Sequence, residues 1–323
     1  MNYKLKKISG DASFREFYRV KKKNKTTIIV FAKKEKFKNL LVYSVVNKIL
    51  NSHKISSPKL IKTFYDDNMI EISDLGDMSF YDYIKNKKNK FKDYKKLIEI
   101  IFQLQKIKLK KNYFLGTKKI KFKKYSIKYL HKESDLFFDW YLKFLIKNKN
   151  LNTIKKALKH ELNNIYKKLH FKNNYFTHRD FHASNIMISK KKLSVIDSQD
   201  AILGNPLYDL ASLIDDVRIK LPKNLQSNLY KYYVLKAKFT AKEKNYLKND
   251  FDILSVQRNL KILGIFVRLY IRDKKPNYLK YLPYTWLLID RRMQNPIFDK
   301  LKILMKTHLP LKKIKKIKKI KKI

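Results

Sequence analysis

The sequence predicts a two-lobed α+β protein in which a small sheet-bearing lobe precedes a larger, mainly helical lobe. Aromatic and β-branched runs dominate the first 73 residues, apolar residues at helical spacing dominate from residue 79 onward, and one polar loop with two short apolar runs interrupts the helices at 176–201. The length of 323 residues suits two lobes, because single domains usually hold about 100–200 residues.

The first lobe is expected to span residues 1–73. "FREFYRV" and "TTIIVFA" flank the polar "KKKNK", which is the pattern of two strands and a turn. "FKNLLVYSVVNKIL" has near-helical apolar spacing, and "NMIEISDLGD" is a short strand that runs into a glycine-containing connector. We place the hinge between the lobes in this connector, at residues 74–78.

The second lobe, residues 79–310, is expected to be mainly helical. "LIEIIFQLQKI" and "TIKKALKHELNNIYKKLHF" repeat apolar residues at helical spacing. Residues 311–323 form a Lys-rich tail with a KKI repeat, whose period of three spreads its Ile residues around a helix. We expect a solvated tail, with contact to a polyanion such as RNA or an anionic membrane as the alternative.

The chain is strongly basic, with 77 Lys+Arg against 27 Asp+Glu and a formal charge of +50. Such a charge suggests a polyanionic partner, but the lysines accompany an excess of Ile, Asn, Tyr and Phe over the whole length, which favours general compositional drift. We expect no obligate nucleic-acid partner. The lack of Cys excludes disulfides and thiolate metal sites, and no apolar run is long enough to cross a membrane. A cytoplasmic protein is therefore expected.

The stretch "FTHRDFHASNIMISKKKLSVIDSQDA" concentrates scarce acids around an Asn. If "NIMIS" and "LSVID" form a hairpin with its turn centred on Lys191, Asn185 faces Asp197 at about 5 Å. An amide oxygen and a carboxylate suit Mg²⁺, which leaves positions for phosphate oxygens. Asp180, on the loop that enters the same end, completes the pattern H-R-D-x-x-x-x-N that phosphoryl transfer uses.

"HRDFHASN", "IDSQDA" and "NPLYDLASL" resemble the catalytic core of the aminoglycoside phosphotransferase superfamily, small-molecule kinases with a protein-kinase-like fold. The resemblance implies ATP and Mg²⁺ as cofactors, Asp180 as catalytic base, and Asn185 and Asp197 as metal ligands. It assigns loop-bracing or structural roles to His178, His182, Asp200 and Asp209. His182 stands where protein Ser/Thr kinases carry Lys, and for Asp209 an ordinary helix N-terminal acid is the alternative.

Four segments in order resemble the bacterial anomeric sugar kinases of cell-wall recycling. They are "GDASFREFYRV", "ESDLFFDWYL", "DSQDAILGNPLYDLASLIDDVR" and "QRNLKILGIFVRLYIRDKKPNYLKYLP". This resemblance implies phosphorylation of the C1 hydroxyl of N-acetylmuramate or N-acetylglucosamine. Two alternatives remain open: a kinase of an amino alcohol, homoserine or an aminoglycoside, and a basic nucleic-acid- or lipid-binding protein on an inactive kinase scaffold.

Nucleotide contacts are expected from the first lobe. The turn "SGDASF" is expected to cover the phosphates with its backbone N–H groups, and Lys33 resembles the strand lysine that grips them, although the helix that follows carries no acid to pair with it. The hinge segment "IEISDLG" is expected to face adenine with its backbone. The nucleotide-binding candidates are Gly10, Asp11, Ala12, Ser13, Lys33, Glu71 and Asp74.

Sugar contacts are expected from the second lobe. Pyranose rings pack on aromatic faces, which makes Trp140 and Tyr141 candidates; for Trp140, core packing is the alternative. Arginine binds carboxylates such as a lactyl group in a bidentate fork, which makes Arg258, Arg268 and Arg272 candidates; ion pairs on the helix surface are the alternative.

Overall fold

The structure, a computed structural model, consists of two compact units. One contains the chain up to Lys123 together with Tyr175–Leu203, and the other contains Lys124–Asn174 and the chain from Gly204 onward. The lobe boundary at 74–78 remains a prediction, because these units are defined by packing alone. The structure describes residues 4–8, 15–22, 25–33, 37–115, 118–146, 150–190 and 192–315.

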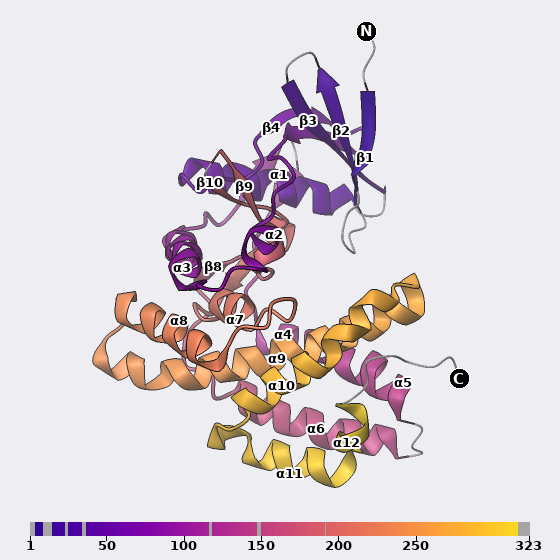
Figure 1. Cartoon of the computed structure of the whole chain (residues 1–323), viewed down its shortest axis with the longest axis vertical. Helices are drawn as coiled ribbons and strands as arrows, with labels where there is room; N and C mark the ends of the chain where they lie inside the picture. Colours follow the sequence, from indigo (N-terminus) through magenta and orange to yellow (C-terminus); the bar gives the residue numbers. More distant parts are fainter. Residues whose placement is uncertain are drawn as a thin grey trace. The chain divides into compact units, whose positions relative to one another are not determined.

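The first unit is built on a five-stranded antiparallel sheet, drawn in indigo and violet in Figure 1. Its order is β1 (Lys4–Ile8), β2 (Arg15–Lys22), β3 (Lys25–Ala32), β5 (Met69–Ser73) and β4 (Leu60–Phe64). The predicted strands β2, β3 and β5 are confirmed. The two edge strands were not predicted, because "KLKKI" and "LIKTF" lack a buried face: all five residues of β4 are exposed.

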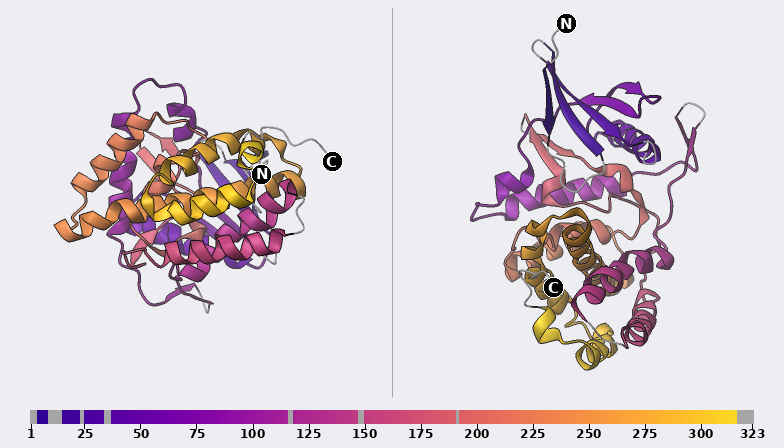
Figure 2. Two further views of the ribbon diagram at one scale, coloured as in Figure 1. Left: turned by 90° about the horizontal axis from the view of Figure 1, so that it is seen from below. Right: turned by 90° about the vertical axis from the view of Figure 1, so that its right-hand side faces the viewer.

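Helix α1 (Phe37–Ser52) packs on this sheet, as Figure 2 shows. Alternate residues of β3 point inward, so that Val30 and Ala32 meet Leu40 and Tyr43 of α1 and Ile70 of β5. The period of two along β3 and the helical spacing along α1 therefore bury one apolar face each, which is the arrangement that stabilises a sheet against a helix.

The rest of the first unit holds short elements around the polar loop. Helix α3 (Phe91–Gln105) buries the predicted Leu97, Ile101 and Leu104. The hairpin contains β9 and β10, and β8 pairs with β11. The elements are α2 (Phe80–Ile84), α3 (Phe91–Gln105), β6 (Tyr113–Leu115), β7 (Lys118–Ile120), β8 (Tyr175–Thr177), η3 (Ala183–Asn185), β9 (Ile186–Ser189), β10 (Lys192–Val195), η4 (Ser198–Asp200) and β11 (Ile202–Gly204).

The second unit is helical and organised around α9 (Ala241–Asp273). This helix begins with a capping box in which Thr240 and Glu243 exchange hydrogen bonds. Gly264 lets α9 approach α4, because a Cβ there would lie 2.2 Å from the backbone of Leu136. The other elements are α4 (Ile127–Leu136), η2 (Phe137–Leu142), α5 (Lys143–Leu145), α6 (Leu151–Tyr166), α7 (Tyr208–Ile214), α8 (Lys223–Lys236), η5 (Pro276–Tyr281), α10 (Leu282–Arg292), η6 (Pro296–Phe298), α11 (Asp299–His308) and α12 (Leu311–Ile314).

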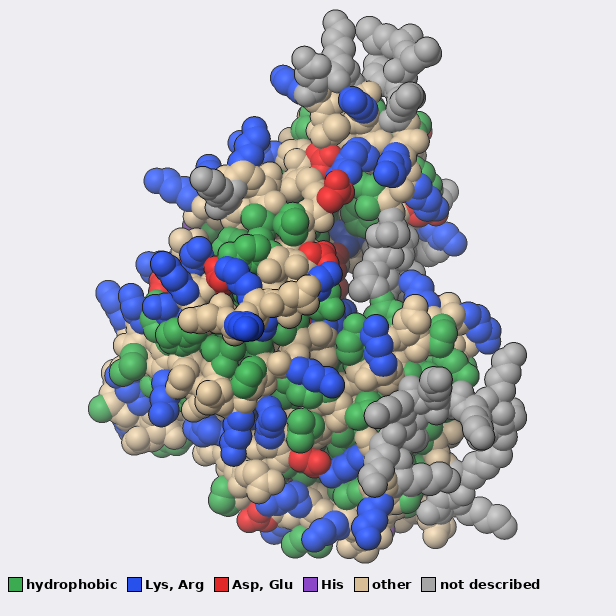
Figure 3. Space-filling model, viewed as in Figure 1, with side chains coloured by type: hydrophobic (Ala, Val, Ile, Leu, Met, Phe, Trp, Pro, Cys, Tyr) green, Lys and Arg blue, Asp and Glu red, His purple; other side chains and the backbone are tan. Residues whose placement is uncertain are grey.

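The start of the Lys-rich tail is packed, which corrects the expectation that the tail is solvated from residue 311. Ile314 is fully buried in α12, and Lys315 forms an ion pair with Asp290 at 2.7 Å. Residues 316–323, which carry most of the KKI repeat, lie outside the described residues. On the face seen in Figure 3, Lys and Arg side chains are scattered among apolar and neutral ones and form no single basic patch. Among the helices described, none combines the length and apolar character that a membrane span requires.

Candidate active site

The hairpin that carries the site has a register one residue away from the predicted one. Ile186 pairs with Val195 and Ser189 with Lys192, and the Ile196 N–H donates to the Asn185 carbonyl at 3.0 Å. Asn185 therefore lies opposite Ile196, and the prediction that it faces Asp197 is wrong. The physical reason is the turn, which has two residues where three were expected.

Asp197 follows the hairpin in a left-handed backbone conformation, with φ 64° and ψ 38°. Arg179 is also left-handed, with φ 72°. Left-handed backbone costs a non-glycine residue about 1–2 kcal/mol and persists only where its surroundings enforce it, most often at functional sites. For Arg179, the enforcing contact is a hydrogen bond from Nη1 to the Asp200 carbonyl at 3.1 Å. Asp200 Oδ1 also lies 3.8 Å from the same nitrogen, and the structural role expected of Asp200 stays a prediction.

His178 is fully buried and joins the two sides of the loop. Its Nε2 lies 3.0 Å from the Ile196 carbonyl, and its Nδ1 lies 3.3 Å from the Asp180 backbone N. Because a carbonyl only accepts and an amide N–H only donates, the ring carries its proton on Nε2 and is neutral. Burial lowers the pKa of His178, against the opposing effect of the Asp180 and Asp197 carboxylates, and thereby favours this neutral form. The contacts fit the predicted role of a loop brace.

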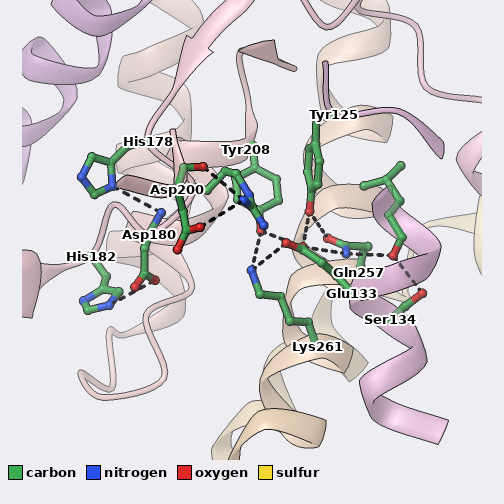
Figure 4. Close-up of polar contacts among 12 residues, drawn as sticks. Tyr125, Glu133, Ser134, His178, Asp180, His182, Asp200, Tyr208, Gln257 and Lys261 are labelled. Atoms are coloured by element: carbon green, nitrogen blue, oxygen red, sulfur yellow. Dashed lines mark hydrogen bonds and ion pairs between the residues drawn. The ribbon is translucent and has the colours of Figure 1, made fainter. Parts of the chain in front are cut away.

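Asp180 is held in place but open to solvent, with 47% of its side chain exposed. The Asn185 amide nitrogen lies 3.0 Å from the Asp180 carbonyl and 3.1 Å from its Oδ2, and His182 Nε2 lies 3.3 Å from Oδ1. Figure 4 shows His178 and His182 with Asp180. A carboxylate that is oriented by neighbours and remains accessible has the arrangement expected of a general base.

The residues at the hairpin end fit a hard cation. Both contacts of the Asn185 side chain with Asp180 are to acceptor oxygens, so its NH₂ group lies there and its Oδ1 is left as a possible ligand. Asp197 is 34% exposed, and its Oδ1 contacts the guanidinium of Arg15. One amide oxygen and one carboxylate match the few protein ligands that Mg²⁺ takes in nucleotide complexes.

The predicted nucleotide-binding residues fall into three groups. Gly10, Asp11, Ala12 and Ser13 lie outside the described residues, and Lys33 is exposed at the end of β3. The carboxylates of Glu71 and Asp74 are used within the unit: Glu71 accepts from Thr27 at 2.6 Å, and Asp74 pairs with Arg19 at 2.6 Å. Contact of the hinge backbone with adenine remains a prediction.

Tyr141 is a core residue, so the prediction that it stacks on a sugar is wrong. Its ring is fully buried and stacks on Phe137 with 5.5 Å between centroids. Its hydroxyl donates to the Ile314 carbonyl at 2.7 Å and accepts from Trp286 Nε1 at 2.6 Å. Trp140 is only half-buried, and its role remains a prediction.

The arginine candidates behave differently from one another. Arg258 is buried and donates to the Asp215 carbonyl at 3.4 Å, so it braces α9 against the end of α7 and does not offer the predicted carboxylate clamp. Arg272 pairs with the adjacent Asp273 at 2.8 Å, which is the surface ion pair weighed as its alternative. Arg268 is half-buried, and its role remains a prediction, as does that of the buried Asp209 in the first turn of α7.

A polar cluster that was not predicted lies where two of the four resembling segments meet. Glu133 begins one segment, and Gln257 and Lys261 belong to another. The Glu133 carboxylate is contacted by Gln257 Nε2 at 3.2 Å, by Lys261 Nζ at 3.1 Å and by the hydroxyls of Tyr125 and Tyr208 (Figure 4). The cluster could have been predicted from polar residues that occupy expected core positions in otherwise apolar helical segments of the sequence.

Comparison with solved structures supports the predicted fold class. A Plasmodium vivax ethanolamine kinase superposes with a TM-score of 0.61 at 14% identity, covering 92% of this chain and 83% of that one. The aminoglycoside phosphotransferase APH(4)-Ia in ternary complex with AMP-PNP and hygromycin B gives 0.60 at 10% identity, covering 90% and 95%. The protein-kinase-like fold, with an antiparallel sheet and a mainly helical remainder, is thereby confirmed.

Comparison with curated proteins finds N-acetylmuramate/N-acetylglucosamine kinases. The one from Neisseria meningitidis serogroup B is 24% identical over 286 residues, covering 87% of this chain and 83% of its own length. The one from Pseudomonas aeruginosa is 25% identical over 279 residues, covering 85% and 79%. A model of the phosphotransferase enzyme family matches residues 4–241. Since that match spans more than half of the chain, the protein belongs to the aminoglycoside phosphotransferase (APH) family of small-molecule phosphotransferases.

Proposed function

We propose that the protein uses ATP and Mg²⁺ to phosphorylate the anomeric C1 hydroxyl of N-acetylmuramate or N-acetylglucosamine. The observation that carries this proposal is the extent of the likeness to kinases named for these two sugars, which covers 85–87% of the chain and so more of it than the family model does. The expected product is a sugar 1-phosphate, which suits peptidoglycan recycling.

The geometry of the loop supports a division of labour among its residues. The exposed Asp180 carboxylate accepts the proton of the attacking hydroxyl, while Asn185 and His182 fix its orientation. His178 stays neutral and holds the loop to the hairpin. Asn185 Oδ1 and the Asp197 carboxylate would hold Mg²⁺, which when bound neutralises charge on the nucleotide phosphates.

Two other functions are less well supported. The solved structures named for choline, ethanolamine or aminoglycoside substrates share only 10–14% identity with this chain, which speaks for the fold alone. A basic binding protein on an inactive scaffold has no need of an accessible Asp180, or of Asn185 and Asp197 at the end of the hairpin.

The test is release of ADP from ATP by the purified protein. N-acetylmuramate, N-acetylglucosamine, homoserine, choline and kanamycin are offered separately, each with Mg²⁺ and with EDTA. Asp180→Asn is the inactive control, and Asp66→Asn, which removes an exposed acid from the turn between β4 and β5, is the matched control. Magnesium-dependent turnover on either amino sugar supports the proposal; turnover confined to another acceptor, or none at all, contradicts it.

A further inference from the structure

Arg15 is one of few buried Lys or Arg side chains in the part of the chain that the structure describes. Among the described residues, the buried ones are Arg15, Lys90 and Arg258. Only 5% of the Arg15 side chain is exposed, and its guanidinium contacts Oδ1 of Asp197 across a sequence separation of 182 residues. Removing a guanidinium from water costs free energy, which a neighbouring carboxylate offsets. The contact with Asp197 therefore accounts for the burial of Arg15.

Two aromatic rings lie close to this guanidinium. Its central carbon lies 5.4 Å from the ring centroid of Phe17 and 4.8 Å from that of Tyr43, on α1. Arginine stacks on aromatic faces through its planar fork, which a lysine ammonium lacks. The Arg15 side chain is therefore oriented before any ligand binds.

Helix α1 is tied to the same loop a second time. One turn after Tyr43, the Asn47 side chain accepts a hydrogen bond from the Ser198 hydroxyl at 3.1 Å. Asp197 and Ser198 are thus gripped from β2 and from α1 together. This grip accounts for the left-handed backbone of Asp197, which needs an enforcing environment.

The Arg15–Asp197 pair also bears on the acid that is missing from α1. No acid occurs anywhere in Phe37–Ser52, so a lysine on β3 has no partner on α1. Arg15, which pairs with Ala32 across the β2–β3 ladder, brings a cation to the end of the sheet where Lys33 follows. In this chain the sheet and α1 contact residues 197–198 through Arg15, which lies close to two aromatic rings, and through Asn47.

We propose that Arg15 is a positioning residue, which holds Oδ1 of Asp197 so that the other carboxylate oxygen faces the metal of the nucleotide complex. This inference rests on the proposed function. Partners that orient a metal-binding carboxylate usually contribute about 10- to 100-fold to metal affinity. Arg15→Ala should therefore weaken metal binding by about that factor. Arg15→Lys should recover only part of it, because an ammonium keeps the charge but not the stacked fork.

The test measures metal binding directly, by Mn²⁺ titration followed by electron paramagnetic resonance in the presence of ADP. Wild type, Arg15→Ala and Arg15→Lys are compared with Lys7→Ala, which removes an exposed cation of the same sheet that pairs with Glu16. The expected result is a dissociation constant for Mn²⁺ that is highest in Arg15→Ala, intermediate in Arg15→Lys and unchanged in Lys7→Ala. The half-saturating Mg²⁺ concentration in the kinase assay should rise in step, with kcat recovering at high Mg²⁺.

Three outcomes overturn the inference. Arg15→Ala that binds Mn²⁺ as tightly as wild type shows that Arg15 does not act on the metal site, and tighter binding shows that it competes with the metal. A lower kcat with unchanged metal affinity assigns Arg15 a structural role. If Arg15→Ala does not fold, Arg15→Lys carries the same test.

Wild type that binds no Mn²⁺ in the presence of ADP refutes the proposed function itself. This result is distinct from a failure of the Arg15 inference, in which wild type binds Mn²⁺ and the Arg15 variants bind it equally well.

Discussion

The loop around Asp180 and the network around Asp215 are both clusters of polar side chains, but they use their hydrogen-bonding atoms differently. Asp180 is half-exposed, and the residue before it, Arg179, has a left-handed backbone. Asp215, at the end of α7, is fully buried; Arg292 donates to both its oxygens at 2.8 and 2.7 Å, and Ser255 also binds it. The loop leaves the oxygens of Asp180 accessible to solvent, whereas the network around Asp215 buries both carboxylate oxygens and bonds them to protein donors. Exposure and backbone strain, more than polarity, separate the residues expected to carry chemistry from those expected to carry stability.

The largest expected effect is on turnover. Asp180→Asn should lower kcat by about 10²- to 10⁴-fold, because the amide cannot accept the proton of the hydroxyl. Its affinity for ADP and its melting temperature should stay close to those of wild type, since the side chain is half-exposed and its size is kept. Near-normal kcat in a steady-state assay would remove Asp180 from the role of base.

Removing a partner from the buried network around Asp215 should lower the free energy of unfolding. Arg292→Leu leaves the buried Asp215 carboxylate without its bidentate partner, and breaking such pairs costs about 3–5 kcal/mol of unfolding free energy. Arg272→Leu, which breaks an exposed pair with Asp273, is the matched control and should cost at most about 1 kcal/mol. Urea denaturation measures both. Equal losses of unfolding free energy in the two variants would mean that the buried Asp215 pair stabilises the protein no more than an exposed ion pair does.

A third prediction concerns pH. Because burial lowers the pKa of His178 below its value in the unfolded chain, the unfolded state binds more protons once the pH falls below about 6.5. His178 should therefore cost stability as the pH falls through that range, by up to about 1.4 kcal/mol per pH unit, and cost nothing above it. His178→Gln keeps a donor but does not titrate, so its unfolding free energy should fall less steeply between pH 7.5 and 5.5. Parallel slopes would show that His178 is not held neutral.

The smallest expected effect tests the reassignment of Tyr141. Tyr141→Phe removes a hydrogen bond to the Ile314 carbonyl and leaves Trp286 Nε1 without its acceptor, which should cost about 1–2 kcal/mol. The KM for the sugar should not change. Trp140→Ala is the counterpart: a raised KM in that variant, with an unchanged KM in Tyr141→Phe, would assign the sugar contact to the half-buried Trp140 alone. A raised KM in Tyr141→Phe would restore the original prediction.

Local chemistry determined how much was predictable. The inner strands β3 and β5 bury apolar residues and were predicted, whereas the exposed edge strands β1 and β4 carry no such pattern. The motif H-R-D-x-x-x-x-N around Asp180 was recognised from its fixed spacing. The register was missed because three consecutive lysines do not specify a turn length.

Long-range contacts were the least predictable part of the site. Arg15 meets Asp197 only after folding, and in a sequence with 77 cations a single Arg carries little distinguishing signal. Its place was nevertheless hinted at by "REFYR", in which alternate residues put two arginines and an aromatic ring on one face of a strand. Tyr141 and Trp140 could not be told apart, because which of two adjacent aromatics enters the core depends on how η2 is wound.

The most direct test of the account compares N-acetylglucosamine with its methyl glycoside, in which the C1 oxygen is blocked and every other hydroxyl is kept. The account predicts magnesium-dependent ADP release with the free sugar, a ³¹P resonance coupled to the anomeric proton of the product, and no turnover with the glycoside. Comparable turnover on the methyl glycoside would contradict it, because the phosphate would then be transferred to another hydroxyl.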